Sequence, residues 1–249
     1  MKILGIIPAR YGSSRFPGKP LVMISGKSMI RRVYEQALQC RELSSVIIAT
    51  DSKVIEKHVR SFDGNVMMTS SSHKSGTERC CEVLEKLEAA GAGPFDIVIN
   101  IQGDEPFIDP RQISSLAEPF KNKNVCIATL VKKINTEEEL RDPNVVKVVF
   151  DRSSTALYFS RQPVPFFREK PQNEWLKERD YFKHVGIYAY RAKVLKEIVA
   201  LPLSSLEKAE SLEQLRWMDN GYELHVHETE FETIAIDTPA DLLKITNIP

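Results

Sequence analysis

The 249-residue sequence lacks an excess of charge of either sign, because 34 lysine and arginine residues balance 34 aspartate and glutamate residues. A balanced chain has no overall field that would attract nucleic acid or an anionic membrane surface. We therefore expect no nucleic-acid partner, and recognition of an anion has to come from a local cluster of cations.

Cysteine is also scarce, and its four positions suit neither a metal site nor a disulfide framework. Cys40, Cys80, Cys81 and Cys126 have no metal-ligand spacing, and two of them are adjacent. Reduced thiols are typical of cytosolic proteins. No apolar run approaches the length of a bilayer, and the first one stops at Pro8, too early for a signal peptide. These absences predict a cytoplasmic protein without membrane insertion.

Apolar runs of strand length alternate with segments of helical periodicity. Strands are predicted at residues 3–9, 45–50, 65–69, 95–101, 184–191, 223–228 and 232–237. Helices are predicted at residues 28–40, 52–60, 78–90, 203–221 and 239–247. This alternation predicts an α/β protein with a Rossmann-like, mostly parallel sheet and helices on both faces.

The texture of the chain changes after about Phe150, where a long stretch is rich in proline, aromatic residues and charge. No internal repeat or low-complexity linker is visible. We therefore predict a single domain over residues 1–249, with a smaller inserted lobe at roughly residues 151–220.

The segment IIPARYGSSRFPGKPL follows directly from the first predicted strand and gathers Arg10, Arg15 and Lys19 in a loop of small residues. Ligands of open parallel sheets bind outside the carboxyl ends of the strands. Glycines permit close backbone approach, and three cations suit several phosphate oxygens. The pattern predicts a phosphate-binding loop, and a solvated basic turn is the alternative.

Neither of the two common phosphate loops is present. One residue too many separates Gly12 from Gly18 for a Walker A loop, and Pro20 replaces its magnesium-binding hydroxyl. The G-x-G-x-x-G dinucleotide pattern is absent as well.

Two aspartates follow predicted strands at the end of the sheet where ligands bind. Asp104 comes after residues 95–101, and Asp237 ends the strand at 232–237, although Asp237 could instead cap the helix that follows. Magnesium prefers a few carboxylates, with phosphate and water completing its shell. The pair predicts a divalent metal site. Among the other acids, Glu105 is interpreted as structural or as a neighbour of the metal ligands.

Other polar residues near predicted helix starts have simpler interpretations. Asp51 is expected to cap the helix at 52–60, and Asp109 precedes a proline as at a helix start. Ser75 and Glu78 fit a capping box. Arg79 opposes the dipole of the helix that it begins, which indicates an anion close by.

The segment PARYGSSRFPGKPL resembles the signature of the nucleotidyltransferases that activate acidic sugars with CTP. Its R-x-P-G-K-P ending is similar in particular to the 3-deoxy-manno-octulosonate (KDO) cytidylyltransferases, whereas sialic-acid relatives usually carry K-N in place of Lys19-Pro20. Further segments extend the resemblance in the same order over nearly the whole chain: ATD, HKSGTER, NIQGDEP, NVVKVV, ALYFSR, HVGIYAYR, LEQLR and IDTPADL.

The resemblance implies the fold of the nucleotide-diphospho-sugar transferases and the reaction of CTP with KDO to give CMP-KDO, which serves lipopolysaccharide synthesis, and pyrophosphate. It implies Mg²⁺ as the cofactor on Asp104 and Asp237, and a homodimer formed through the inserted lobe. The catalytic residues that it implies are Arg10, Lys19, Asp104 and Asp237. The nucleotide contacts that it implies are Ala9, Arg10, Ser13, Arg15, Lys19, Ser75, Gly76, Gln102 and Asp104.

The sugar contacts that the resemblance implies, together with our reading of the HKSGTER segment, are Arg79, Arg161, His184, Tyr188, Glu213 and Gln214. Strand alternation puts His184 and Tyr188 on one face, although a histidine on a strand is ordinary. Without the resemblance, Glu213 and Gln214 would be solvated surface residues. The alternatives are a cytidylyltransferase for amino-KDO or sialic acid and a non-catalytic nucleotide-binding module.

Overall fold

The computed structural model describes residues 1–12, 16–232, 236, 238 and 241–242. The chain divides into two compact units. Unit 1 contains Met1–Ala117, Ala189–Val199 and Glu232–Pro249, and unit 2 contains Glu118–Tyr188 and Ala200–Phe231. The division falls within strand β10.

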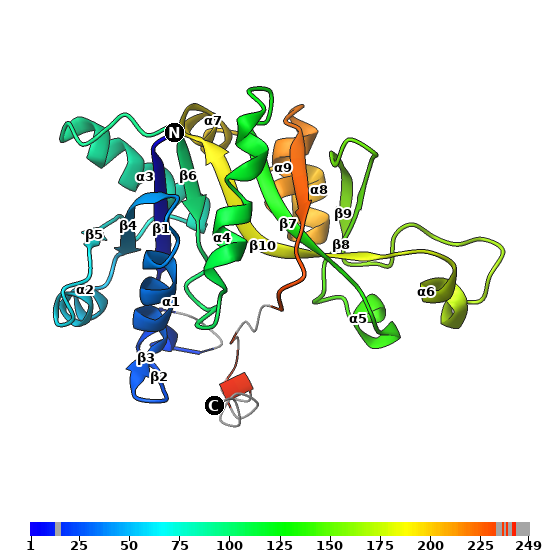
Figure 1. Cartoon of the computed structure of the whole chain (residues 1–249), viewed down its shortest axis with the longest axis horizontal. Helices are drawn as coiled ribbons and strands as arrows, with labels where there is room; N and C mark the ends of the chain where they lie inside the picture. Colours follow the sequence, from blue (N-terminus) through cyan, green and yellow to red (C-terminus); the bar gives the residue numbers. More distant parts are fainter. Residues whose placement is uncertain (13–15, 233–235, 237, 239–240, 243–249) are drawn as a thin grey trace. The chain divides into compact units, whose positions relative to one another are not determined.

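Unit 1 is built on a mostly parallel sheet, in which the end of β10 runs opposite to β6 (Figure 1). Its strands are β1 (Ile3–Ala9), β4 (Leu43–Thr50), β5 (Val66–Met68), β6 (Ile97–Asn100) and the end of β10 (Phe182–Arg191), beside a short hairpin of β2 (Met23–Ile24) and β3 (Lys27–Ser28). Its helices are η1 (Lys19–Leu21), α1 (Met29–Leu38), α2 (Lys53–Arg60), α3 (Gly76–Ala89), α4 (Pro110–Ser115) and α7 (Ala192–Val199). The pairs β1–β4, β1–β6 and β4–β5 are parallel. This arrangement confirms the predicted α/β fold.

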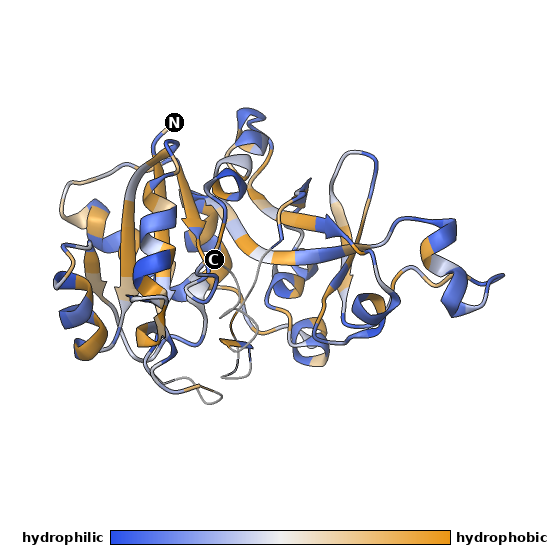
Figure 2. Cartoon of the chain, turned by 60° about the horizontal axis from the view of Figure 1, so that its bottom comes forward, coloured by the Kyte–Doolittle hydropathy of each residue, from blue (hydrophilic) through white to orange (hydrophobic). Residues whose placement is uncertain are grey.

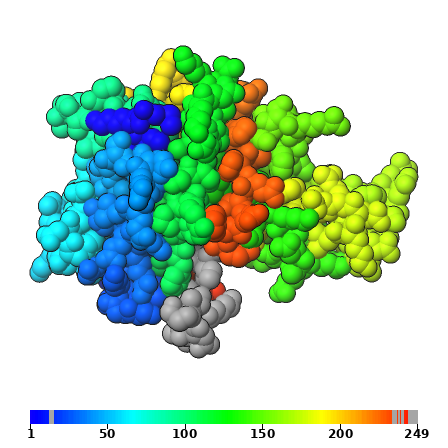
Figure 3. Space-filling view, in the orientation of Figure 1, coloured from blue at the N-terminus to red at the C-terminus, as the bar shows by residue number. Residues whose placement is uncertain are grey.

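Burial explains why these segments form the centre of the sheet. All four residues of β6 and six of the seven in β1 are buried, as expected of strands covered on both faces. Helix α1 covers one face with its apolar side chains, and its side chains lie in front of β1 (Figures 1 and 3). Helix α3, in the connection from β5 to β6, packs against β1 and β6, and a right-handed crossover is the rule for such connections. In Figure 2 the strands are mainly apolar, and the sides of the helices that face away from the sheet are mainly polar.

The strand order of unit 1 creates a switch point between β1 and β6. From β1 the chain moves to β4 and β5 on one side, and it then returns to add β6 on the other side of β1. Ligands of open α/β sheets bind outside the carboxyl ends of strands at such a point. The loop that begins at Arg10 and the loop that carries Asp104 therefore start at neighbouring positions.

Gly103 allows the second of these loops to pass close to the first strand. A Cβ atom at this position would lie 2.7 Å from the carbonyl oxygen of Pro8. Such a contact is shorter than packed atoms tolerate, so the backbone beside Asp104 can follow this course only without a side chain at position 103.

Unit 2 combines parallel and antiparallel strand pairing (Figure 1). Its strands are β7 (Ile127–Lys133), β8 (Lys147–Phe150), β9 (Ala156–Ser160), the first part of β10 and β11 (Leu224–Glu228). Its helices are η2 (Glu118–Lys121), α5 (Glu137–Arg141), η3 (Gln172–Glu174), α6 (Trp175–Glu178), α8 (Ser205–Glu210) and α9 (Gln214–Asp219). Strand β11 runs parallel to β7, whereas β8 is antiparallel to both β9 and β10.

Several predicted elements need correction. The single helix expected at 203–221 is wrong, because Ser211 adopts a left-handed conformation with φ of 53° and separates α8 from α9. Strands β7 and β8 were not predicted, although their valine and isoleucine content was the signal. The strand expected at 232–237 and the helix expected at 239–247 lie largely outside the described residues.

The boundaries of the units differ from those expected of the inserted lobe. Unit 2 begins at Glu118, whereas the lobe was placed at roughly residues 151–220. A role for it in sugar binding and dimerisation stays a prediction. Within the described part of the chain, every helix is too short or too polar to cross a bilayer.

Replacing Gly103 with alanine is expected to lower the free energy of unfolding by about 1–3 kcal/mol, because the new methyl group is forced against the Pro8 carbonyl. Urea unfolding of the purified variant measures this change. The control is Gly12→Ala, since a Cβ atom at Gly12 meets no described atom within 4 Å. A Gly103→Ala midpoint equal to that of the wild type would contradict the close approach.

Candidate active site

The loop after β1 is organised by a backbone turn that leads into η1. Gly18 has φ of 70°, a left-handed conformation that glycine adopts without strain. Its N–H donates to the carbonyl oxygen of Tyr11 at 2.9 Å. Arg10 follows the buried last residue of β1, Ala9, and is half-buried. Two further residues of the predicted phosphate loop, Ser13 and Arg15, lie outside the described residues.

Lys19 and Asp104 meet at the carboxyl ends of β1 and β6. The Lys19 Nζ donates to the Asp104 Oδ2 at 2.8 Å, and the two side chains are 11% and 31% exposed. A nearly buried ammonium group is costly without a partner, so the carboxylate accounts for its position. The partial exposure of Asp104 leaves the carboxylate accessible to a ligand. The structure thus brings together two of the predicted catalytic residues.

Ile236, the residue before Asp237 in the sequence, lies beside Asp104 in unit 1. The N–H of Ile236 donates to the main-chain carbonyl oxygen of Asp104 at 3.0 Å. The Ile236 side chain is fully buried against Ile24 and Met29. Asp237 itself lies outside the described residues, but its neighbour in the sequence is anchored to Asp104.

Glu105 differs from Asp104 in its surroundings. Its side chain is buried, and its Oε2 atom has no hydrogen-bond partner among the described residues. Burial, together with the charge of Asp104, raises the pKa of Glu105 to about 8. The protonated form of Glu105 is therefore favoured at neutral pH.

The N-terminus of α3 lies at the same edge of the sheet. Ser75 caps it by accepting a hydrogen bond from the Glu78 N–H at 3.2 Å, so half of the expected capping box is formed. A Cβ atom at Gly76 would lie 3.3 Å from the Asn100 Nδ2 and 3.4 Å from Pro8. Of the predicted base-binding residues, Gly76 is thereby packed against the ends of β6 and β1, and Ser75 directly precedes it. Gln102, the third of them, belongs to the loop that carries Asp104.

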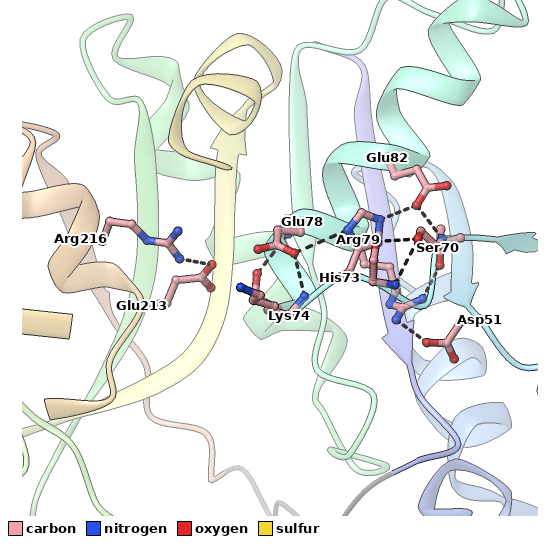
Figure 4. A network of polar contacts seen from close by, with 12 residues as sticks. Asp51, Ser70, His73, Lys74, Glu78, Arg79, Glu82, Glu213 and Arg216 are labelled. Atoms are coloured by element: carbon pink, nitrogen blue, oxygen red, sulfur yellow. Dashed lines mark hydrogen bonds and ion pairs between the residues drawn. The ribbon is translucent and has the colours of Figure 1, made fainter. Parts of the chain in front are cut away.

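Three contacts order the segment that precedes α3 (Figure 4). The Ser70 N–H donates to Glu82 at 2.8 Å, and His73 forms a short contact with the same carboxylate. The Lys74 N–H donates to Glu78 at 2.7 Å, in place of the Ser75 N–H that a full capping box would use. These contacts hold the backbone that leads to Ser75.

Arg79 has a structural partner. Its guanidinium donates to Asp51 at 2.8 Å and also to the hydroxyl of Thr69, and its side chain is 0% exposed (Figure 4). The anion that we expected close to Arg79, because this cation opposes the dipole of α3, is therefore Asp51. The prediction that Asp51 caps α2 is wrong, because Ser52 accepts the capping bond from Ile55. We leave this enclosed cation out of the sugar site.

In unit 2, an aromatic cluster surrounds two of the predicted sugar contacts. The His184 ring lies 5.2 Å from the rings of Phe159 and Tyr188, and Tyr188 lies 5.2 Å from Trp217. Burial lowers the pKa of His184 to about 3. Burial and the charge of Glu213 raise the pKa of Tyr188. Both side chains are therefore neutral near pH 7 and can exchange hydrogen bonds with a neutral hydroxyl.

Gln214 is not a solvated surface residue. It is 4% exposed, and its amide Nε2 has no hydrogen-bond partner among the described residues. Most buried polar groups are paired, so this amide donor beside Glu213 is available to a ligand or to water. Glu213 itself contacts Arg216 at 3.2 Å.

Main-chain oxygens hold the guanidinium of Arg161. It donates to the carbonyl oxygens of Glu210 at 2.7 Å, Pro143 at 2.9 Å and Ser211 at 3.5 Å. The Glu210 carboxylate accepts instead from the Arg161 main chain and from Ser160. No described carboxylate neutralises this guanidinium, which is thus oriented and keeps its charge for an anion.

Comparison with known proteins identifies the family of this chain. The family model of cytidylyltransferases matches residues 4–230. A protein of Parabacteroides distasonis named 3-deoxy-manno-octulosonate cytidylyltransferase is 53% identical over 248 residues, which cover 98% of this chain and 96% of the relative. A protein of the same name from Bacteroides thetaiotaomicron is 53% identical, with 97% and 96% covered. The chain belongs to the 3-deoxy-manno-octulosonate cytidylyltransferase family.

A solved structure agrees with membership of this family. The chain is similar to a CMP:2-keto-3-deoxy-manno-octonic acid synthetase complexed with CTP, with 44% identity, a TM-score of 0.90 and coverage of 99% of this chain and 97% of that one. A putative glucose-1-phosphate thymidylyltransferase from Bacillus anthracis is 18% identical, covers 98% of this chain and 94% of its own, and has a TM-score of 0.64. That likeness shows the fold alone.

Replacing Asp51 with asparagine is expected to lower the free energy of unfolding by about 2–4 kcal/mol, because Arg79 then stays buried without a counter-charge. Urea unfolding measures the change. The matched control is Glu56→Gln, which removes the exposed contacts with Lys53 and Arg60 and should change stability little. Equal effects of the two substitutions would contradict a structural role for the Asp51–Arg79 pair.

Proposed function

We propose that this protein transfers CMP from CTP to 3-deoxy-D-manno-octulosonate and releases pyrophosphate. The observation that carries the proposal is the Lys19–Asp104 pair at the switch point of the parallel sheet, in a chain that matches relatives of this activity over nearly its whole length.

We assign the triphosphate of CTP to the edge formed by the loop after β1. Arg10 and Lys19 supply cations there, and the N-terminus of α3 adds the positive end of a helix dipole. Ser75, Gly76 and Gln102 are assigned to the cytosine, whose donor and acceptor groups suit main-chain and amide contacts. Ser13 and Arg15 join this set on the family resemblance alone.

We propose Mg²⁺ as the cofactor, held by Asp104 and Asp237. The donor set fits, because hard carboxylate oxygens suit magnesium and phosphate and water can complete its shell. The hydrogen bond from Ile236 to Asp104 supports the pair, since it anchors the residue next to Asp237. The described residues contain no group of three or more His, Cys, Asp or Glu side chains that could hold a metal. Two carboxylates suffice for a metal that is shared with phosphates. When bound, the ion would offset the phosphate charge and polarise the α-phosphate.

We assign the acidic sugar to the polar groups of unit 2. Arg161 suits the sugar carboxylate because its guanidinium is oriented by carbonyl oxygens and lacks a described carboxylate partner. His184, Tyr188, Glu213 and Gln214 suit the hydroxyl groups. The unpaired amide of Gln214 supports this assignment most directly.

In the proposed reaction, the anomeric hydroxyl oxygen of the sugar bonds to the α-phosphorus of CTP. The bond between that phosphorus and the oxygen bridging to the β-phosphate breaks, pyrophosphate leaves, and the hydroxyl proton goes to solvent. Arg10 and Lys19 stabilise the negative charge that develops on the departing group. The protein mainly orients the reactants, so we expect no covalent enzyme intermediate.

We further propose that the protein acts in the cytoplasm as a homodimer. The four cysteines are free, which suits a reducing compartment. The large exposed apolar side chains of unit 2 support a subunit contact there: Leu157, Phe166, Leu203 and Leu206.

Replacing Asp104 with asparagine is expected to lower kcat at least about 100-fold, because a preorganised charge is removed from the reacting phosphate, while the Kd for CTP rises less than tenfold. Pyrophosphate release and calorimetric titration with CTP measure the two quantities. In the wild type, chelation with EDTA should abolish turnover, and added magnesium should restore it.

Asp63→Asn makes the same chemical change in a turn outside the site. Asp63 has φ of 58°, a conformation that asparagine also tolerates, so this variant should keep wild-type kcat. Retention of wild-type turnover by Asp104→Asn would overturn the assignment. Absence of turnover in the wild type, with CTP still bound, would favour a nucleotide-binding module.

A panel of acidic sugars tests the acceptor. With CTP and magnesium, pyrophosphate should form with KDO at a kcat/KM at least about 100-fold above that with sialic acid, because hydrogen-bonding pockets reject acceptors that leave their polar groups unpaired. Amino-KDO belongs in the same panel. A preference for sialic acid or amino-KDO over KDO would reject the substrate and keep the reaction type.

A further inference from the structure

The hydroxyl of Thr129 lies among three polar atoms in unit 2. Its Oγ1 is 2.8 Å from the carbonyl oxygen of Ile187, 3.2 Å from that of Val185 and 3.0 Å from the Nε2 of His184. Thr129 is fully buried within β7. Neither the family resemblance nor the site described above gives this residue a role.

The single hydroxyl proton of Thr129 limits which of the three contacts it can donate to. A threonine hydroxyl has one proton and two acceptor lone pairs, and carbonyl oxygens only accept. The proton is therefore directed to Ile187, the nearer carbonyl, with Val185 sharing it. The Oγ1 atom has no second proton for His184, so the third contact exists only if the Nε2 of His184 carries the hydrogen and donates it to Thr129.

We infer that Thr129 is a positioning residue that fixes His184 in the neutral Nε2–H tautomer, so that the Nδ1 atom is a hydrogen-bond acceptor for a hydroxyl of the sugar. The inference rests on the proposed function insofar as His184 contacts the sugar. The choice of tautomer rests only on Thr129 and the two carbonyl oxygens.

The surroundings of His184 agree with this role. The rings of Phe159 and Tyr188 lie 5.2 Å away at interplanar angles of 81° and 47°, which restricts rotation of the imidazole. Burial disfavours the doubly protonated ring, in which Nδ1 could not accept. Among the described residues, Nδ1 has no hydrogen-bond partner, which leaves its lone pair for a ligand.

This arrangement makes His184 selective for a donor. In the neutral Nε2–H imidazole, the Nδ1 atom accepts a hydrogen bond from a sugar hydroxyl. It cannot donate a hydrogen bond to a group that only accepts. Without the Thr129 hydroxyl, the ring is free to populate the Nδ1–H tautomer, which repels the same hydroxyl proton. Thr129 therefore affects sugar binding without touching the sugar.

Nitrogen NMR of the full-length protein labelled at the imidazole nitrogens tests the tautomer directly. The chain has only five histidines, and loss of one set of signals in His184→Gln assigns those of His184. At neutral pH, the wild type should show Nε2 as the protonated nitrogen and Nδ1 as the bare one. Thr129→Val should shift His184 towards the Nδ1–H form, and Thr129→Ser, which keeps the hydroxyl, should retain the wild-type signals.

Steady-state kinetics provide the second measurement. In Thr129→Val, the KM for KDO should rise about tenfold, the cost of one misdirected hydrogen bond, with the KM for CTP unchanged. Thr129→Ser should restore the wild-type KM for KDO. The matched control is Thr155→Val, which removes a hydroxyl for which the structure gives no side-chain hydrogen bond, and it should change neither the His184 signals nor either KM.

Each result decides the inference. An Nδ1–H tautomer in the wild type would overturn it, as would His184 signals that are the same in Thr129→Val and the wild type. A Thr129→Ser variant that behaves like Thr129→Val would overturn the role of the hydroxyl. If Thr129→Val fails to fold, the wild-type and Thr129→Ser spectra still decide. If the wild type makes no pyrophosphate from KDO, the proposed function fails, whereas the spectra continue to test the tautomer.

Discussion

The ion pair between Lys19 and Asp104 joins two segments that are 85 residues apart in the sequence, and the geometry of the proposed active site depends on it. The pair exists because β1 and β6 are adjacent and parallel, so the loops that follow them emerge at one edge of the sheet. Gly18 turns the first loop towards this edge, and Gly103 lets the second loop pass close to Pro8. Packing of the sheet thus sets the position of the charges.

The sequence was sufficient to predict this part of the molecule because the relevant signals are local. Continuous apolar runs predicted β1 and β6, and a polar residue directly after such a run lies at the ligand-binding edge whatever the details of packing. The break between α8 and α9 was not predictable in the same way. No glycine or proline marks the break at Ser211, whose left-handed conformation is one that serine rarely adopts.

Burial of polar side chains was the harder property to predict. Gln214 lies in a stretch whose composition is typical of a solvated helix, yet it is enclosed. Thr129 looks like an ordinary strand residue, and only the positions of Ile187 and His184 give its hydroxyl a direction. Neither fact depends on a sequence pattern, because each arises from contacts between segments that are distant in the chain.

The two strand-end aspartates of unit 1 show what separates a structural carboxylate from a candidate ligand. Asp51 and Asp104 both follow parallel strands, and both pair with a cation at 2.8 Å. Arg79 is wholly enclosed, so its charge is committed to Asp51 and the pair holds α3 against the strands. Asp104 is partly exposed, with 31% of its side chain accessible, and its Oδ1 atom has no partner among the described residues. Position in the fold therefore makes both aspartates candidate ligands. Only Asp104 has a carboxylate oxygen without a described partner, which makes it suitable for phosphate chemistry.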